Sequence, residues 1–196
     1  MIAVGLRPTM KPTRRIIFND PGHAHFLTFS CFRRCQLLTE EWTCWLMAVS
    51  LNQARERHDF DLWAYVFMPD HVHLLIRPRA PIYTVSGILQ SIKGPFARKY
   101  LADCRERHPE RLKRLEVTTQ SGIRHRVWER GGGYDRNLVT SDVIRRAIEY
   151  IEFNPVRRGL VGDAEHWKWS SAGARAGVKD IPFSIDEVNW DLVPIG

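Results

Sequence analysis

The sequence predicts an α+β fold in which helices pack on an antiparallel sheet. Segments with strand and helix patterns follow one another in the order strand, helix, strand, strand, helix, strand, helix. Two of the strands are close enough to form a hairpin, and single helices connect the others. This order matches a ferredoxin-like topology. The length of 196 residues fits one such domain with short appendages.

The first strand and the first helix are expected in the first third of the chain. Residues 25–32 are rich in β-formers, and the side chains on one face are apolar. Thr39 can cap a helix whose first turn contains two glutamates. Apolar residues then follow at helical spacing: Trp42, Trp45, Leu46 and Val49. We expect the helix to end near residue 58.

The second and third strands form the predicted hairpin. Residues 59–68 are dense in aromatic side chains, and residues 71–77 form a second run of β-formers that Pro78 ends. Pro69 and Asp70 lie between them and favour a tight turn. The two strands are therefore expected to pair antiparallel.

A long helix and a charged connection follow the hairpin. The helix should start near Thr84, and Pro95 should kink or interrupt it. Its apolar stripe consists of Val85, Ile88, Leu89, Ile92, Phe96 and Tyr100. Residues 103–126 are charged and weakly patterned, so we expect a basic connection that is partly disordered.

A last strand and a last helix complete the fold. Residues 126–130 are expected to form the strand, and the glycines at 131–133 a flexible turn. Ser141 should cap a helix that runs to Asn154, because Pro155 disfavours helical backbone at the residue before it. The apolar stripe of this helix consists of Ile144, Ala147, Ile148 and Ile151.

The charge indicates a polyanionic partner. The net charge is +7, and most of the basic residues are arginines, whose planar guanidinium matches phosphate oxygens. Nucleic acid is the partner that this favours, although a basic protein without such a partner is an equally open reading. We divide the chain into a basic arm (1–20), a central domain (21–176) and an acidic tail (177–196).

The composition also bears on the compartment. No apolar run is long enough for a membrane span, and the first residues lack the pattern of a secretory signal. The four cysteines form no CxxC pair, which is typical of reduced thiols. We therefore expect a cytoplasmic protein with no membrane partner.

Two histidines of the third strand suggest a metal site. His71 and His73 stand two residues apart, so their side chains leave the strand on one face and Val72 points to the core. Two neutral imidazoles are half of a metal site. Such a pair is more often structural, and His23 and His25, also two apart, are expected to be structural.

The last helix carries a phenol and an amide on one flank. Tyr150 lies beside the apolar stripe, and Asn154 follows one turn later. Taken alone, this pattern favours a tyrosine that packs its ring at the boundary of the core. If it faced the imidazole pair, the set could hold a divalent ion, align a phosphate and attack it.

Five segments, in order, are similar to a known family. They are FLTFSCFRR, FMPDHVHLLI, VWERGGGYDR, AIEYIEFNPVRRGLV and HWKWSSAG, within about residues 14–176. The sequence resembles the REP-associated tyrosine transposases and the related single-strand insertion-sequence transposases, which are HUH endonucleases. The resemblance implies a ferredoxin-like (RRM-like) HUH fold, a Mg or Mn ion on His71 and His73, and Tyr150 as nucleophile. The third ligand of such sites is commonly glutamine, where this sequence has Asn154.

The resemblance also implies a reaction and a substrate. Single-stranded DNA, at imperfect hairpins of repeat sequences, would be cleaved through a 5′-phosphotyrosine intermediate and rejoined. Basic side chains are expected along the DNA path: Arg14, Arg15, Arg33, Arg34, Lys93, Arg98 and Lys99. Whether the protein acts as a monomer or a homodimer is left open.

Two other functions are weighed against this one. A ferredoxin-like sheet can also be a non-catalytic module that binds single-stranded nucleic acid, although no strand carries the aromatic pattern of the RNA-binding platforms. A metal-dependent hydrolase that uses water would leave Tyr150 with a structural role. Tyr100 and Tyr134 are rival nucleophiles, the first expected in the core and the second after a flexible turn.

Overall fold

The central element is a four-stranded antiparallel sheet with the strand order β2-β3-β1-β6. The computed structural model describes residues 19–131, 133–179, 181–182 and 184–195. The strands are β1 (Ala24–Ser30), β2 (Phe60–Met68), β3 (His71–Pro78) and β6 (Tyr134–Leu138). This order, with one helix after β1 and one after β3, is the predicted ferredoxin-like α+β topology.

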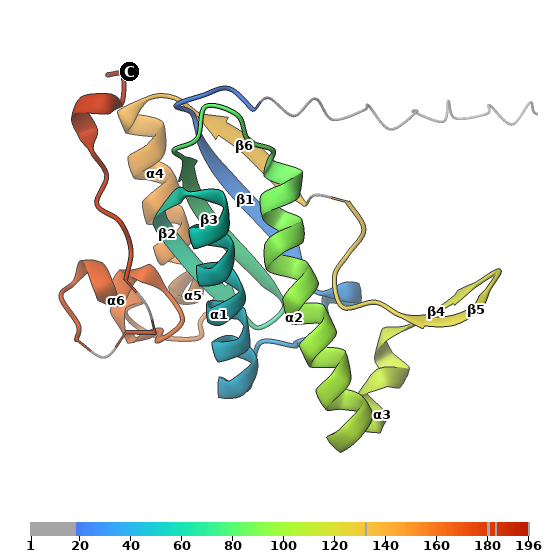
Figure 1. Cartoon of the computed structure of the whole chain (residues 1–196). Coiled ribbons are helices and arrows are strands. Elements are labelled where there is room, and N and C mark those ends of the chain that lie inside the picture. The colour runs from blue at the N-terminus through green and yellow to red at the C-terminus, as the bar shows by residue number, and fades with distance from the viewer. Residues whose placement is uncertain (1–18, 132, 180, 183, 196) are drawn as a thin grey trace, which may run out of the picture.

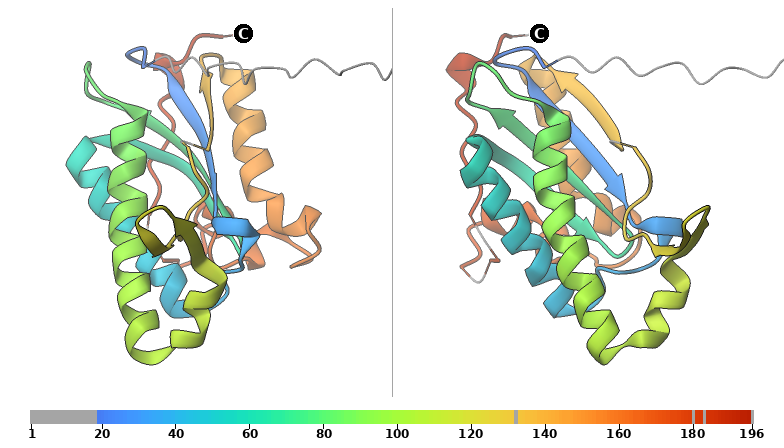
Figure 2. Two further views of the ribbon diagram at one scale, coloured as in Figure 1. Left: turned by 90° about the vertical axis from the view of Figure 1, so that its right-hand side faces the viewer. Right: turned by 45° about the vertical axis from the view of Figure 1, so that its right-hand side comes forward.

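Helices cover both faces of the sheet. The long helices α1 (Glu41–His58) and α2 (Val85–Arg107) pack side by side on one face, and α4 (Ser141–Glu152) lies on the other (Figures 1 and 2). Within the described residues, no helix is long and apolar enough to cross a membrane.

The remaining elements are short. The helices are α3 (Pro109–Leu112), α5 (Asn154–Arg157) and α6 (Ser171–Arg175), and single 3₁₀ turns lie at Phe32–Arg34, Lys113–Leu115, Ala164–His166 and Trp190–Leu192. The strands β4 (Glu116–Thr119) and β5 (Gly122–His125) pair into a hairpin that projects away from the main sheet (Figure 1).

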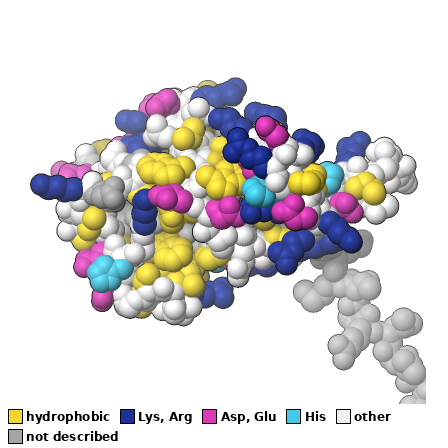
Figure 3. Space-filling model, turned by 90° about the horizontal axis from the view of Figure 1, so that it is seen from below, with side chains coloured by type: hydrophobic (Ala, Val, Ile, Leu, Met, Phe, Trp, Pro, Cys, Tyr) yellow, Lys and Arg dark blue, Asp and Glu magenta, His cyan; other side chains and the backbone are white. Residues whose placement is uncertain are grey.

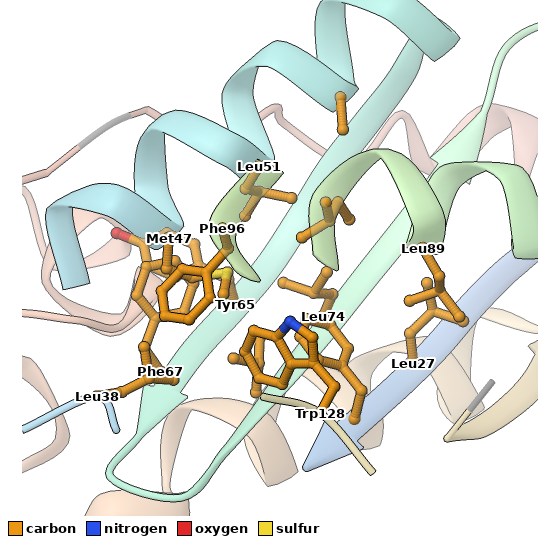
Figure 4. Close-up of a cluster of buried hydrophobic side chains, with 14 of the residues drawn as sticks. Leu27, Leu38, Met47, Leu51, Tyr65, Phe67, Leu74, Leu89, Phe96 and Trp128 are labelled. Atoms are coloured by element: carbon orange, nitrogen blue, oxygen red, sulfur yellow. The ribbon is translucent and has the colours of Figure 1, made fainter. Parts of the chain in front are cut away.

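The larger core fills the space between the sheet and the two long helices. The side chains of the predicted α2 stripe, from Val85 to Tyr100, are all buried there. Leu27, Leu74 and Trp128 meet them from the sheet side (Figure 4). The helix runs through Pro95 without interruption, and the Thr84 side chain caps it by accepting from the Gly87 amide.

The smaller core lies between α4 and the opposite face. Ile144, Ile148 and Ile151 pack against Val66 and Leu75, as the predicted stripe requires. The contacts of α4 with the sheet are mainly to β2 and β3. The half of this face formed by β1 and β6 therefore extends beyond the helix.

Two predictions about α1 are wrong. The helix begins at Glu41, and the Thr39 hydroxyl donates to the Gln36 carbonyl instead of capping it. Trp45 and Val49 are 41% and 42% exposed, because the buried face is set by Met47 and Leu51. Trp45 packs edge-on against Trp169 at the border of the core.

The predictions for residues 103–130 are also wrong. The charged connection continues α2 and then forms α3, a 3₁₀ turn and the β4–β5 hairpin. Residues 126–130 contribute one isolated bridge, from Trp128 to Cys31, and the fourth strand of the main sheet is β6. The sequence of β6, YDRNL, is mostly polar, as is common in an edge strand. It therefore lacks the alternation of apolar residues from which a strand is predicted.

The last helix differs from its prediction at both ends. Thr140 precedes its first turn, and the backbone N–H of Ser141 donates to the Pro194 carbonyl, so the C-terminal segment supplies the acceptor. The helix ends at Glu152, and Asn154 begins the next short helix, α5.

The C-terminal segment follows the free edge of β2. Asp186 exchanges two hydrogen bonds with the Leu62 backbone, one from its own N–H and one to its carboxylate. The Phe67 N–H donates to the Trp169 carbonyl, and the Tyr65 N–H to the Ser171 hydroxyl. Trp169, Ser171 and Asp186 are thus hydrogen-bonded to the main sheet, and the Ser171 hydroxyl also donates to Glu152 of α4.

Gly133 allows the chain to cross β1 closely, and its replacement should destabilise the fold. Its φ is +73°, and a Cβ atom there would overlap the carbonyl oxygen of Thr28 and lie 2.9 Å from its carbon. We expect Gly133→Ala to lower the free energy of unfolding by about 2–4 kcal/mol, measured by urea denaturation.

Gly131 is the matched control. Its φ is +88°, but a Cβ atom there meets nothing within 4 Å. Gly131→Ala should therefore cost only the left-handed backbone strain, about 1–2 kcal/mol. Equal losses in the two variants would show that the close approach to Thr28 has no energetic role.

Candidate active site

The two histidines of β3 lie together on the face that α4 covers. His71 and His73 alternate with Val72 and Leu74, which enter the larger core, as a strand with a period of two requires. Both imidazoles are buried, with exposures of 4% and 5%. Their Nε2 atoms lie 3.1 Å apart, so the predicted pair converges on one point.

A polar partner fixes the other nitrogen of each ring. Nδ1 of His71 lies 2.6 Å from the Asp70 carboxylate and donates its proton there, which leaves a lone pair on Nε2. Nδ1 of His73 lies 2.7 Å from the Thr28 hydroxyl on the neighbouring strand. Metal-binding histidines show this same arrangement, in which the outer nitrogen is held by a carboxylate or a neutral oxygen.

Burial favours the neutral form of both imidazoles. It lowers the pKa of His71, and it lowers that of His73 to about 3, with further contributions from His71 and Arg157. Neutral imidazole is the form that binds a metal ion. His25 differs, since it is fully buried on the other face and hydrogen-bonded to Asp135 and Tyr83, which confirms its predicted structural place.

Tyr150 stands over the histidine pair at the end of α4. Its side chain is 44% exposed, and its ring centroid lies 5.6 Å from that of His73 in an edge-to-face contact. Asn154 is buried one turn later, and both line one recess with His71 and His73. The phenol and amide of one flank thus face the imidazole pair.

Three arginines complete the recess. Arg34, Arg157 and Arg158 line it together with the histidines. The Arg157 guanidinium lies 4.0 Å from the centre of the Tyr150 ring and donates to the Tyr150 carbonyl. Arg34 is brought in by a turn with left-handed backbone, φ 55°, and lies 3.3 Å from Asp70.

Arg157 and Arg158 were absent from the sequence-based site. The NPVRRG segment is the signal that could have found them. Its two arginines follow Tyr150 and Asn154 closely in sequence, and the short helix α5 brings them to the same recess.

The other predicted DNA contacts lie elsewhere. Arg33 is exposed and stacks on Phe32, and Lys93 is on α2, 3.3 Å from the Gly131 carbonyl. Arg98 and Lys99 are also on α2, on the opposite side of the sheet from the recess. Arg14 and Arg15 lie outside the described residues. Of the described members of the set, only Arg34 lines the recess.

The surface charge supports no single extended patch in the region around the lower ends of the long helices. Lys and Arg side chains are interspersed there with acidic and hydrophobic ones (Figure 3). The recess, in contrast, gathers three arginines in one place, an arrangement that suits an anion.

The rival tyrosines occupy different surroundings. Tyr100 is in the larger core, stacked on Trp42 and Phe96, and burial raises the pKa of its phenol. Tyr134 is 48% exposed and contacts Phe26, which also contacts Tyr150. Its strand pairing with β1 holds its backbone, contrary to the free turn expected there.

The donor set fits a divalent cation. In the described part of the chain, no three His, Cys, Asp or Glu side chains are grouped as ligands. The two Nε2 atoms lie 3.1 Å apart. Two ligand atoms that bind one ion at a right angle, each at about 2.1 Å from it, are separated by about 3.0 Å, which is close to this distance. Asn154 adds an amide oxygen, a ligand type suited to Mg or Mn. Such an ion would complete its coordination with water or phosphate oxygens.

Comparisons with known proteins show the family and the fold of the chain. The family model described as "Transposase IS200 like" matches residues 21–152. A REP-associated tyrosine transposase of Haemophilus influenzae is 30% identical over 121 residues, which are 61% of this chain and 63% of that protein. The match thus spans less than two thirds of that relative. A solved REP-associated tyrosine transposase bound to a REP hairpin is similar in fold, with a TM-score of 0.60 and 20% identity over 94% of this chain and 98% of that one.

Proposed function

The chain belongs to the family of IS200-like transposases, and from this we propose that it cleaves and rejoins single-stranded DNA with Tyr150 as the nucleophile. Membership makes it a DNA-processing enzyme by class. The observation that carries the finer proposal is the meeting of Tyr150, a neutral histidine pair and three arginines in one recess. A phenol, a candidate metal site and cationic groups are what phosphoryl transfer to a protein side chain needs.

The reaction can be written from the residues that line the recess. The Tyr150 phenol oxygen attacks the scissile phosphorus, releases its proton to solvent and forms a phosphotyrosine ester. The bond from phosphorus to the 3′ oxygen breaks, and that oxygen takes up a proton to become a hydroxyl. Because the 5′ phosphate stays esterified and no water is consumed, a 3′ hydroxyl can reverse the step and reseal the strand.

The arginines and the histidines have separate tasks in this scheme. Arg34, Arg157 and Arg158 offset the charge of the phosphate and orient it, and Arg157 also holds the Tyr150 ring. His71, His73 and Asn154 would hold Mg or Mn, which supplies Lewis-acid polarisation of the phosphate when bound.

A single strand is the substrate that we propose. Tyr150 lies at the end of a helix beside a sheet, and a phosphate must enter the recess in line with the phenol. A flexible single strand can adopt that position, whereas an intact duplex cannot without distortion. The solved neighbour is bound to a REP hairpin, so we propose an imperfect hairpin as the recognition element.

The test is to capture the covalent intermediate. We expect a DNA strand taken from inverted repeats beside the gene, folded as a hairpin with single-stranded extensions and labelled at its 3′ end, to form a protein adduct with Mg or Mn. The adduct appears as a shifted band on a denaturing gel. The same strand annealed to its full complement should give none.

Two outcomes would replace the proposal. A free 5′ phosphate without any adduct would indicate a hydrolase that uses water. Tight binding of the hairpin without any cleavage would indicate a non-catalytic module for single-stranded nucleic acid.

A further inference from the structure

A second cavity adjoins the recess on the part of the sheet that extends beyond α4. It measures about 680 Å³, within the range of about 300–1,000 Å³ that small-molecule sites occupy. It is lined by Phe26, Thr28, His73, Tyr134, Arg136 and Tyr150, with apolar side chains of α4 behind them. His73, Thr28 and Tyr150 belong to both spaces, so an occupant of the cavity would touch the candidate active site directly.

Three elements build the cavity. Phe26 and Thr28 of β1 form the floor, because alternate residues of this strand point away from the larger core. Tyr134, Arg136 and Leu138 of β6 form one wall by the same alternation. The short side chains of Val143 and Ala147 on α4 form the other wall and leave the space open.

The lining is aromatic, with cations beside it. The Phe26 ring stacks on His73 and meets Tyr134 and Tyr150 edge-on at 5.8 Å and 5.7 Å. Arg136 and Arg146 line the same cavity, and both are exposed. A flat heteroaromatic ring that carries a nearby negative charge fits this combination, because rings stack on aromatic side chains and guanidinium groups bind phosphate.

We propose that this cavity binds a nucleobase of the DNA strand, next to the phosphate that Tyr150 attacks. This rests on the proposed function, since the shared wall places base and phosphate on neighbouring nucleotides of one strand. The base stacks on Tyr134 and Phe26, and Arg136 contacts the backbone phosphate beyond it. A base bound in the cavity is unstacked from its neighbours in the strand, and its own position determines which phosphate lies in the recess. The cavity therefore selects the cleavage position.

The experiment measures whether the loss of one DNA base and the loss of the Tyr134 ring have coupled effects on binding. The probe is the labelled DNA hairpin with single-stranded extensions, and an abasic nucleotide replaces each extension position in turn. Affinity is measured by fluorescence anisotropy in EDTA, with the full chain and with Tyr134→Ala. At one position, the abasic change should weaken binding of the unaltered chain by about ten-fold and should have little further effect on Tyr134→Ala.

Two variants separate stacking from other effects. Tyr134→Phe keeps the ring and should preserve the coupling, whereas Arg136→Gln should weaken binding equally for all abasic probes. Arg98→Gln on the far side of the sheet is the charge-matched control and should change affinity less than Arg136→Gln.

Three results would overturn the inference. One is the absence of coupling at every position, which would leave the cavity to another segment of this chain or to a second copy. Another is that Tyr134→Phe loses the coupling as completely as Tyr134→Ala does, because the coupling would then come from the Tyr134 hydroxyl and not from stacking on its ring. The third is an equal loss of affinity in Arg98→Gln and Arg136→Gln. Failure of the proposed function is seen separately, because it removes the adduct and leaves the affinity measurement intact.

Discussion

Tyr150→Phe should abolish the covalent protein–DNA adduct and lower the cleavage rate by more than about 10⁴-fold, because it removes the phenol oxygen that forms the ester in the proposed reaction. The ring stays, so its contacts with Phe26, His73 and Arg157 remain. Binding of the hairpin probe should therefore change by less than about two-fold. The measurement is the adduct band on a denaturing gel beside an anisotropy titration of the same preparation.

The two rival tyrosines are the controls. Tyr100→Phe alters a core residue on the opposite face of the sheet, and Tyr134→Phe alters the neighbouring cavity, so both variants should still form the adduct. An adduct that persists in Tyr150→Phe and disappears in Tyr134→Phe would move the nucleophile from α4 to β6.

The double variant His71→Ala, His73→Ala should lose at least about 10³-fold in cleavage rate with Mg or Mn, because it removes both imidazoles that we propose as ligands of the ion. EDTA should give the same loss in the unaltered chain, and added Mn should reverse it. Hairpin affinity should stay largely intact, since the three arginines of the recess are unchanged.

Stability must be measured alongside, because both histidines are buried and hydrogen-bonded. Circular dichroism and urea unfolding show whether the double variant is folded. His166→Ala, an exposed histidine that pairs only with Asp163 among the described contacts, should keep full activity. Full cleavage by a folded double variant, or cleavage that resists EDTA, would remove the metal site from the proposal.

Regular patterns in the sequence predicted the parts of the fold that a single periodicity determines. The alternation of β3 placed His71 and His73 on one face, and the stripe of α2 predicted its buried side. The stripe of α4 placed Tyr150 at its border, where the structure has it. In each case one face of the element is buried and the other is not, which is the condition under which such patterns are informative.

The remaining features depend on partners that are distant in sequence. The strand β6 is short and polar, and its place is set by pairing with β1, about a hundred residues earlier. Arg157 and Arg158 reach the recess because the chain turns at Phe153. Pro155 signalled the end of the helix, but not the direction that the chain takes after it. The cavity beside the recess exists because α4 packs mainly on β2 and β3 and meets β6 near Leu138, which leaves a space over the rest of β6.

The path of the C-terminal segment along β2 has a consequence for how the protein associates. An unpaired edge strand is a template on which another chain can add a strand, and this is a common route to aggregation. Here the C-terminal segment already hydrogen-bonds to the outer backbone groups of β2. Asp186 pairs with Leu62, Ser171 with Tyr65, and Trp169 with Phe67. Sheet extension from one molecule to the next is thereby blocked at this edge. The opposite edge is β6, where an added strand would lie beside the cavity proposed for the nucleobase and would compete with the DNA there.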